Sequence, residues 1–191
     1  MSLQATTSQT VGPFFHIGCH WLHQEQLAAA GIAGERVTIQ GRVFDGDGVP
    51  VPDAFLEIWQ ANAAGRYAHA EDRQDKALDP NFRGFGRVFT DAEGRYGFTT
   101  IRPGRVAGRG NTLQAPHINV AIFARGLLKQ LTTRIYFADQ SAANEADPVL
   151  SAIDDAAIRR TLLAAPVEST IPTYRFDIVL QGEGETAFFE I

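Results

Sequence analysis

The stretch Ala115-Pro-His-Ile-Asn-Val-Ala-Ile-Phe-Ala-Arg-Gly126 decides the fold of this chain. From 117 to 125, apolar and β-branched residues alternate with other residues at period two, which predicts a β-strand. Successive side chains of a strand point to opposite faces. One face is therefore uniformly apolar, formed by Ile118, Val120, Ile122 and Ala124. Such a face is typical of a strand buried on one side of a sandwich.

The opposite face of this strand carries polar groups. His117 and Asn119 lie two residues apart on it, and Arg125 stands at its far end. Two histidines at this spacing would point two imidazoles at one metal ion, but asparagine is a much poorer ligand for a transition metal. The residues alone leave two interpretations open, a structural polar pair or the remainder of a metal site.

The rest of the chain also carries mainly β signals. Alternation and turn residues predict strands at 36–45, 54–60, 128–137 and 173–180, and a hairpin formed by 86–90 and 95–101. We expect loops at 61–85 and 102–111, and short helices at 21–30 and 155–164. This pattern predicts an all-β fold, with a β-sandwich core at 36–180, long loops and one or two short helices.

Residues 1–20 are predicted to form an extended arm. The run Thr10-Val-Gly-Pro-Phe-Phe-His-Ile-Gly18 has turn residues and aromatic residues but no period. An arm this apolar is expected to pack on its own domain or on a neighbour. Together with the arm, residues 1–191 are expected to form a single domain.

Composition narrows the classes of function. The net charge of -5, from 17 Lys+Arg and 22 Asp+Glu, argues against a nucleic-acid or anionic-membrane partner. The first twenty residues lack the features of a signal peptide, and no run is apolar enough to span a bilayer. The single cysteine, Cys19, excludes an internal disulfide and a cysteine-based metal cluster. We therefore expect a cytoplasmic protein.

Taken singly, each polar residue that stands out has an ordinary structural explanation. Tyr67 can cover the edge of the core, His117 can be a buried histidine, and Arg125 can be a surface charge. Gly12-Pro13 alone is a turn. No glycine-rich phosphate loop, nucleophile elbow or paired-carboxylate pattern competes with these residues.

Several longer motifs together resemble the intradiol ring-cleaving dioxygenases. They are Leu56-Glu-Ile-Trp-Gln-Ala-Asn-Ala-Ala-Gly-Arg-Tyr67, Leu78-Asp-Pro-Asn-Phe82, Ile101-Arg-Pro-Gly104, Pro116-His-Ile-Asn119 and Tyr174-Arg-Phe-Asp-Ile178. The resemblance covers nearly all of the chain, from Ser8 to the last strand. It implies a β-sandwich with a ferric site that opens a catechol ring between its two hydroxylated carbons. Phenolate and imidazole donors suit ferric iron.

In that family two tyrosines and a His-x-His pair hold the iron. Matched position by position, the resemblance puts Tyr67 and His117 at two ligand positions, but Val106 and Asn119 at the other two. Gln114 stands where the family has an arginine that helps to polarise the substrate. The resemblance therefore implies that this chain holds no catalytic iron and is inactive alone.

Members of the family that cleave protocatechuate are built from two homologous chains, an iron-binding β and an iron-free α. Ser8-Gln-Thr-Val-Gly-Pro13, Phe123-Ala-Arg-Gly126 and Gln181-Gly-Glu-Gly-Glu-Thr186 are similar to the α chain. This similarity implies that a β partner holds Fe(III), and that protocatechuate and O2 react at the α/β interface to give 3-carboxy-cis,cis-muconate. It also implies that four residues of this chain line the substrate, namely Thr10, Gly12, Pro13 and Arg125. A guanidinium can hold the substrate carboxylate.

Two other hypotheses remain open from the sequence. In the first, the chain is a non-catalytic β-sandwich binding or scaffold protein derived from the same fold. In the second, it builds an unorthodox metal site from Tyr67, His117 and an outside donor such as His69. The alignment with the family also predicts that Tyr67 and His117 lie close together in the fold.

Overall fold

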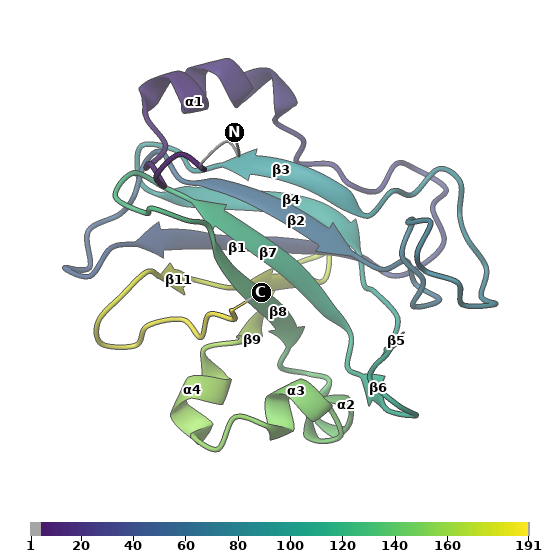
Figure 1. Cartoon of the computed structure of the whole chain (residues 1–191). Helices are drawn as coiled ribbons and strands as arrows, with labels where there is room; N and C mark the ends of the chain where they lie inside the picture. The colour runs from purple at the N-terminus through teal and green to yellow at the C-terminus, as the bar shows by residue number, and fades with distance from the viewer. Residues whose placement is uncertain (1–4, 191) are drawn as a thin grey trace.

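The computed structural model describes residues 5–190, and a folded-over sheet of nine strands forms its centre (Figure 1). These strands are β1 (Arg36–Phe44), β2 (Phe55–Gln60), β3 (Phe85–Phe89), β4 (Arg95–Ile101), β7 (His117–Phe123), β8 (Leu131–Phe137), β9 (Leu163–Val167), β10 (Thr173–Arg175) and β11 (Ile178–Val179). Their order is β11-β1-β10-β9-β8-β7-β2-β3, with β4 on the other side of β1. A separate pair consists of β5 (Val106–Ala107) and β6 (Leu113–Gln114).

The sheet folds into two layers around one core. The antiparallel strands β8, β7, β2 and β3 form one layer, and β4, β1 and β10 form the other, while the parallel pair of β8 and β9 connects them. Inward side chains of both layers belong to the same buried cluster, for example Ile39 of β1 and Val120 of β7. The predicted all-β sandwich is therefore confirmed, including the apolar face of the 117–125 stretch.

The predicted strands exist, with ends shifted by up to three residues. The exception is 173–180, which divides into β10 and β11 around Phe176 and Asp177. The Asp177 carboxylate accepts a hydrogen bond from the backbone N–H of Arg42 (3.0 Å), so a side chain replaces a ladder contact at the break. The 61–85 loop is confirmed up to Gly84, whereas the expected loop at 102–111 contains β5.

The predicted hairpin at 86–90 and 95–101 is wrong. Its turn forms, because Gly94 N–H donates to Asp91 O (2.9 Å). However, β3 pairs with β2 and β4 pairs with β1, so the turn carries the chain from one layer to the other. Val88 and Phe98 both reach the same core, and they do so from opposite layers.

The predicted helix at 21–30 is also wrong. The helices lie earlier, at α1 (Pro13–Cys19) and the 3-10 turn η1 (His20–Leu22), so the part of the arm that the structure describes is not wholly extended. After η1 the chain runs along β4, with Leu27 N–H donating to Thr99 O (2.8 Å). Leu27 is buried in the core by this pairing. Tertiary burial has overridden the local helix signal.

Short helices cluster below the sheet in Figure 1. They are α2 (Ser141–Glu145), α3 (Pro148–Ser151) and α4 (Ala156–Arg160). The prediction of a helix at 155–164 was too long, because β9 already begins at Leu163, and the other two helices were not predicted. Over residues 5–190, every helix falls short of the length and apolarity that crossing a bilayer requires.

Candidate functional site

The predicted site residues fall into two groups at opposite ends of β7. His117 begins this strand, and Arg125 follows its last residue, Phe123. At about 3.3 Å per residue, the strand alone separates its ends by about 20 Å. In Figure 1, β7 runs from the side of β5 and β6 to the side of α1.

The first group consists of the four positions matched to metal ligands, Tyr67, Val106, His117 and Asn119, and is called the metal-position group below. The Tyr67 hydroxyl accepts a hydrogen bond from Asn119 Nδ2 (3.2 Å), and His117 is the preceding residue on the same strand face. Tyr67 and Val106 line one hollow of about 920 Å³, together with Trp59, His69 and Phe85 among others. The structure thus brings positions from three distant segments to one place.

Hydrogen bonds within the 61–84 loop hold Tyr67 in place. The Tyr67 backbone N–H donates to Asp72 Oδ2 (2.7 Å), and Asn62 Oδ1 accepts from the N–H groups of Ala64 and Arg66 (both 3.0 Å). The Tyr67 ring stacks on Trp59 with centroids 5.5 Å apart. Burial raises the pKa of Tyr67, although the Asn119 hydrogen bond and the charge of Arg134 oppose this rise.

A chain of contacts from Asp147 fixes His117. Buried Asp147 caps α3 and also accepts from Ala115 N–H (2.6 Å), while Ala115 O lies 2.8 Å from His117 Nδ1. The imidazole is almost completely buried beside Tyr136. Burial, and then the positive charge of Arg134, lower the pKa of His117 to about 4. His117 is therefore neutral at physiological pH.

The metal-position group does not fit a ferric ion. Val106 offers no donor atom, and Asn119 turns its amide N–H toward Tyr67 instead of a lone pair. Tyr67 and His117 remain, two donors where the family uses four. Between residues 5 and 190, no three His, Cys, Asp or Glu side chains gather as a metal site. His69, the outside donor considered above, uses Nδ1 to accept from Glu71 N–H (3.2 Å).

The second group consists of Thr10, Gly12, Pro13 and Arg125, and is called the arm group below. Thr10 Oγ1 accepts from Gly126 N–H (2.7 Å), so the arm is fastened to the turn that carries Arg125. Gly12 caps α1 and Pro13 is its first residue. The structure therefore brings the four predicted substrate-lining residues to one end of the molecule.

Helix α1 covers part of the outer sheet face beside the arm group. Phe15 packs edge-on against Phe55 of β2 (5.4 Å between centroids), and His16 packs against Phe89 of β3 (4.7 Å). The other side of this segment is uncovered in the single chain. Its large apolar side chains are exposed, namely Phe14 at 86%, Ile17 at 68% and Trp21 at 80%.

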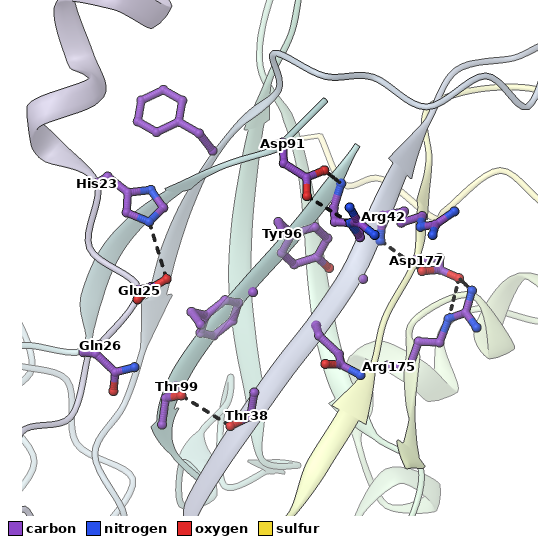
Figure 2. Close-up of a pocket in the computed structure, with 16 residues that line it drawn as sticks. His23, Glu25, Gln26, Thr38, Arg42, Asp91, Tyr96, Thr99, Arg175 and Asp177 are labelled. Carbon is purple, nitrogen blue, oxygen red and sulfur yellow. Dashed lines mark hydrogen bonds and ion pairs between the residues drawn. The ribbon is translucent and has the colours of Figure 1, made fainter. Parts of the chain in front are cut away.

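Another hollow, of about 760 Å³, lies over the outer face of β1 and β4 (Figure 2). It contains none of the predicted site residues. The two aspartates labelled there are already paired with arginines, Asp91 with Arg95 (2.9 Å) and Asp177 with Arg175 (2.7 Å). Its chemistry is that of a salt-bridged sheet surface, so we do not place the site there.

Sequence reasoning missed three residues that shape the two groups. Arg134, on β8, lies opposite Asn119 of β7. Asp147 accepts a hydrogen bond from Ala115, just before β7 begins, and Asp53 pairs with Arg125 (3.1 Å). Alternation in the predicted strand at 128–137 shows which residues of that strand share a face, but it does not show which residues of another strand lie beside them. The register against β7, which brings Arg134 to Asn119, is not readable from alternation.

Comparisons with known proteins agree with this geometry. The family model described as Dioxygenase matches residues 11–182. The chain belongs to the intradiol ring-cleaving dioxygenase family, whose members are iron enzymes. Within the family, the protocatechuate 3,4-dioxygenase alpha chain of Pseudomonas putida is 42% identical over 98% of this chain and 97% of its own length.

Two further comparisons extend the relationship. The protocatechuate 3,4-dioxygenase beta chain of Burkholderia cepacia is 42% identical over 80% of this chain and 67% of its own length. The dioxygenase domain of a carbohydrate-binding fusion protein from Streptomyces sp. SirexAA-E has a TM-score of 0.60 at 26% identity, covering 86% of this chain and 89% of that one. The sandwich is therefore the fold of intradiol dioxygenases.

Proposed function

We propose that this chain is the alpha subunit of a protocatechuate 3,4-dioxygenase. In this role a homologous beta chain holds Fe(III), and the complex uses O2 to cleave protocatechuate between its two hydroxylated carbons, giving 3-carboxy-cis,cis-muconate. The alpha chain lines the active site and supports assembly, and is inactive alone. Similarity to an alpha chain over the whole length supports this role, as does the misfit of the chain's own donors to iron.

The separation of the two groups along β7 is the observation that carries the proposal. The arm group lies about 20 Å from the metal-position group, far beyond the reach of one arginine side chain. A carboxylate held by Arg125 therefore cannot belong to a substrate in this chain's own hollow. The arm group makes chemical sense only at a site that another chain completes.

Gly12 supports the same conclusion. Its backbone is extended (φ -109°, ψ 178°), a conformation open to any residue, and a Cβ added there would meet nothing within 4 Å. Neither backbone strain nor packing within this chain requires glycine at this position. We infer that the missing side chain leaves room for the substrate or for the surface of the partner.

Arg125 has the chemistry needed for a carboxylate. Its side chain is 65% exposed, and Nε contacts Asp53 Oδ1 at 3.1 Å. A guanidinium carries five N–H groups in a planar fork, so the terminal nitrogens remain to grip a second carboxylate. Asp53 therefore fixes Nε of the Arg125 guanidinium, while its two terminal nitrogens face solvent.

The test is Arg125→Ala in the complex reconstituted with a beta chain. A charge-assisted hydrogen bond contributes about 1.5–3 kcal/mol, so the KM for protocatechuate should rise about 10- to 100-fold while iron content stays unchanged. Catechol, which lacks the carboxylate, should react equally with both complexes. Arg109→Ala is the matched control, because Arg109 is also exposed but lies in the loop between β5 and β6.

An unchanged KM for protocatechuate would overturn the role of Arg125. It would favour the second candidate function, a binding or scaffold protein that keeps the family's fold without its pocket. This second function is favoured by the incomplete set of iron donors, since Val106 and Asn119 stand at ligand positions. Iron bound stoichiometrically by the chain alone would contradict both functions.

A further inference from the structure

A positively charged side chain lies beside the metal-position group. In the ladder between β7 and β8, Asn119 is directly opposite Arg134, and His117 is directly opposite Tyr136. Opposed residues of antiparallel strands share a face, with Cβ atoms about 4.5–5.5 Å apart. The Arg134 side chain therefore leaves the sheet on the same face as the positions matched to the family's His-x-His pair.

The contacts of Arg134 join it to this site. Its Nη1 donates to Gln114 Oε1 (2.7 Å) and lies 3.3 Å from the Tyr136 hydroxyl. The guanidinium also lies over the ring of Phe189, 5.8 Å from its centroid. One cation thus holds an amide oxygen, a phenol and an aromatic face, all neutral groups.

The polar groups of the site pair with one another in two separate sets of hydrogen bonds, without a metal. Asn119 Nδ2 joins the Tyr67 hydroxyl to Trp59 O (3.2 and 3.3 Å), and Arg134 joins Tyr136 to Gln114. Among the described residues, Arg134 has no carboxylate within salt-bridge distance, and the buried Asp147 is linked to it only through the Tyr136 hydroxyl, which lies 3.4 Å from Asp147 Oδ1. A partly buried guanidinium without a directly paired anion opposes the approach of any further cation.

We propose that Arg134 is the resident cation of this site: its guanidinium supplies the positive charge beside the metal-position group, holds Gln114 and Tyr136 in place, and excludes metal ions. The metal-position group then differs from an iron site in two separate ways, the loss of two donors and the gain of a fixed positive charge. The fold alone places Arg134, so this inference stands apart from the identity of the substrate and of the partner chain.

The two differences can be separated in the full chain by substitution. Val106→Tyr with Asn119→His restores all four donors and keeps Arg134, and adding Arg134→Gln removes the charge while retaining an N–H donor. The matched variant Arg134→Lys retains the charge. Ferric iron is the probe, measured by metal content after dialysis and by the visible charge-transfer band of phenolate bound to iron.

We expect the four-donor chain that also carries Arg134→Gln to bind ferric iron at least about tenfold more tightly than the four-donor chain with arginine or lysine at that position. Equal iron binding by all three chains would overturn the exclusion of metal by Arg134. Tight binding by the lysine variant alone would do the same, because lysine keeps the charge.

The single variants test the resident cation even if no four-donor chain takes up iron. Arg134→Gln without other changes should lower the Tm by about 4 °C, and Arg134→Lys should lower it by no more than half as much. If lysine is no better tolerated than glutamine, the positive charge is not what holds Gln114 and Tyr136 in place, and the proposal fails.

Discussion

His117 shows how burial sets the chemistry of one residue. It lies beside Tyr136 and near Arg134, and its pKa falls from 6.5 to about 4. In the unfolded chain the imidazole takes up its proton near pH 6.5. Between these values the unfolded state binds more protons, so the free energy of unfolding falls as the pH falls through this window. The full effect of this shift is about 3 kcal/mol.

Replacing His117 with asparagine should remove this pH dependence. An asparagine amide can donate to Ala115 O as Nδ1 does, but it does not titrate. From pH 7 to about 4.5, wild-type chain should lose about 2–3 kcal/mol more of its free energy of unfolding than His117→Asn, as measured by urea denaturation. His69→Asn, at an exposed histidine, should behave as wild type. Parallel pH profiles for wild type and His117→Asn would show that the buried imidazole does not control acid stability.

At the scale of elements, a glycine in β1 permits the break between β10 and β11. A Cβ added to Gly41 would lie 1.8 Å from Phe176 O, which is the atom that accepts the Tyr96 hydroxyl hydrogen bond (2.6 Å). The chain can therefore cross close to β1 only where β1 has no side chain. This contact positions the last strands against the core.

Gly41→Ala should consequently destabilise the fold by about 2 kcal/mol or more, because backbone atoms must shift to admit one methyl group. The matched control is Gly97→Ala on the neighbouring strand β4, where a Cβ would make only an ordinary contact, 3.5 Å from Ile39 O. That change should alter the free energy of unfolding by less than about 1 kcal/mol. Urea denaturation of both variants provides the comparison, and equal losses would argue against the close crossing.

Local pattern predicted which segments are strands better than it predicted which strands pair. The alternation in β1, β2, β7 and β8 is visible because each buries one face in the core. The failed hairpin had correct strands and a correct turn, but its two strands bury in opposite layers. Only tertiary structure decides that, and it also drew Leu27 onto β4 in place of a helix.

The candidate site shows the same division. The residue types of the metal-position group were readable from the sequence through the resemblance to the family. The contact between Tyr67 and Asn119, however, spans 52 residues and depends on how the 61–84 loop folds over β7. Arg134 was not predicted, because its place opposite Asn119 is a matter of strand register.

For the whole molecule, the arrangement of exposed apolar surface indicates where another chain binds. Phe14, Ile17 and Trp21 project from the α1 and η1 segment next to the arm group, and each is more than two-thirds exposed in the single chain. Large apolar side chains clustered on a surface mark sites of protein association. The proposed beta partner would therefore cover this segment while approaching Arg125.

The double variant Phe14→Ser/Ile17→Ser should separate assembly from folding. Exposed substitutions usually change the free energy of unfolding by less than about 0.5 kcal/mol, so the chain alone should remain as stable as wild type. Interface anchors cost about 2 kcal/mol or more when truncated, so affinity for a beta chain should fall at least about 30-fold.

Size-exclusion chromatography with light scattering on co-purified chains measures this loss of assembly. Ile158→Ser is the control, because Ile158 is 45% exposed on α4, a helix that lies away from α1 in Figure 1. It should leave the complex intact. If the double variant and the control assemble equally well, α1 does not form the interface. The beta chain would then bind at a surface away from the arm group, and the separation of the two groups along β7 would need another explanation.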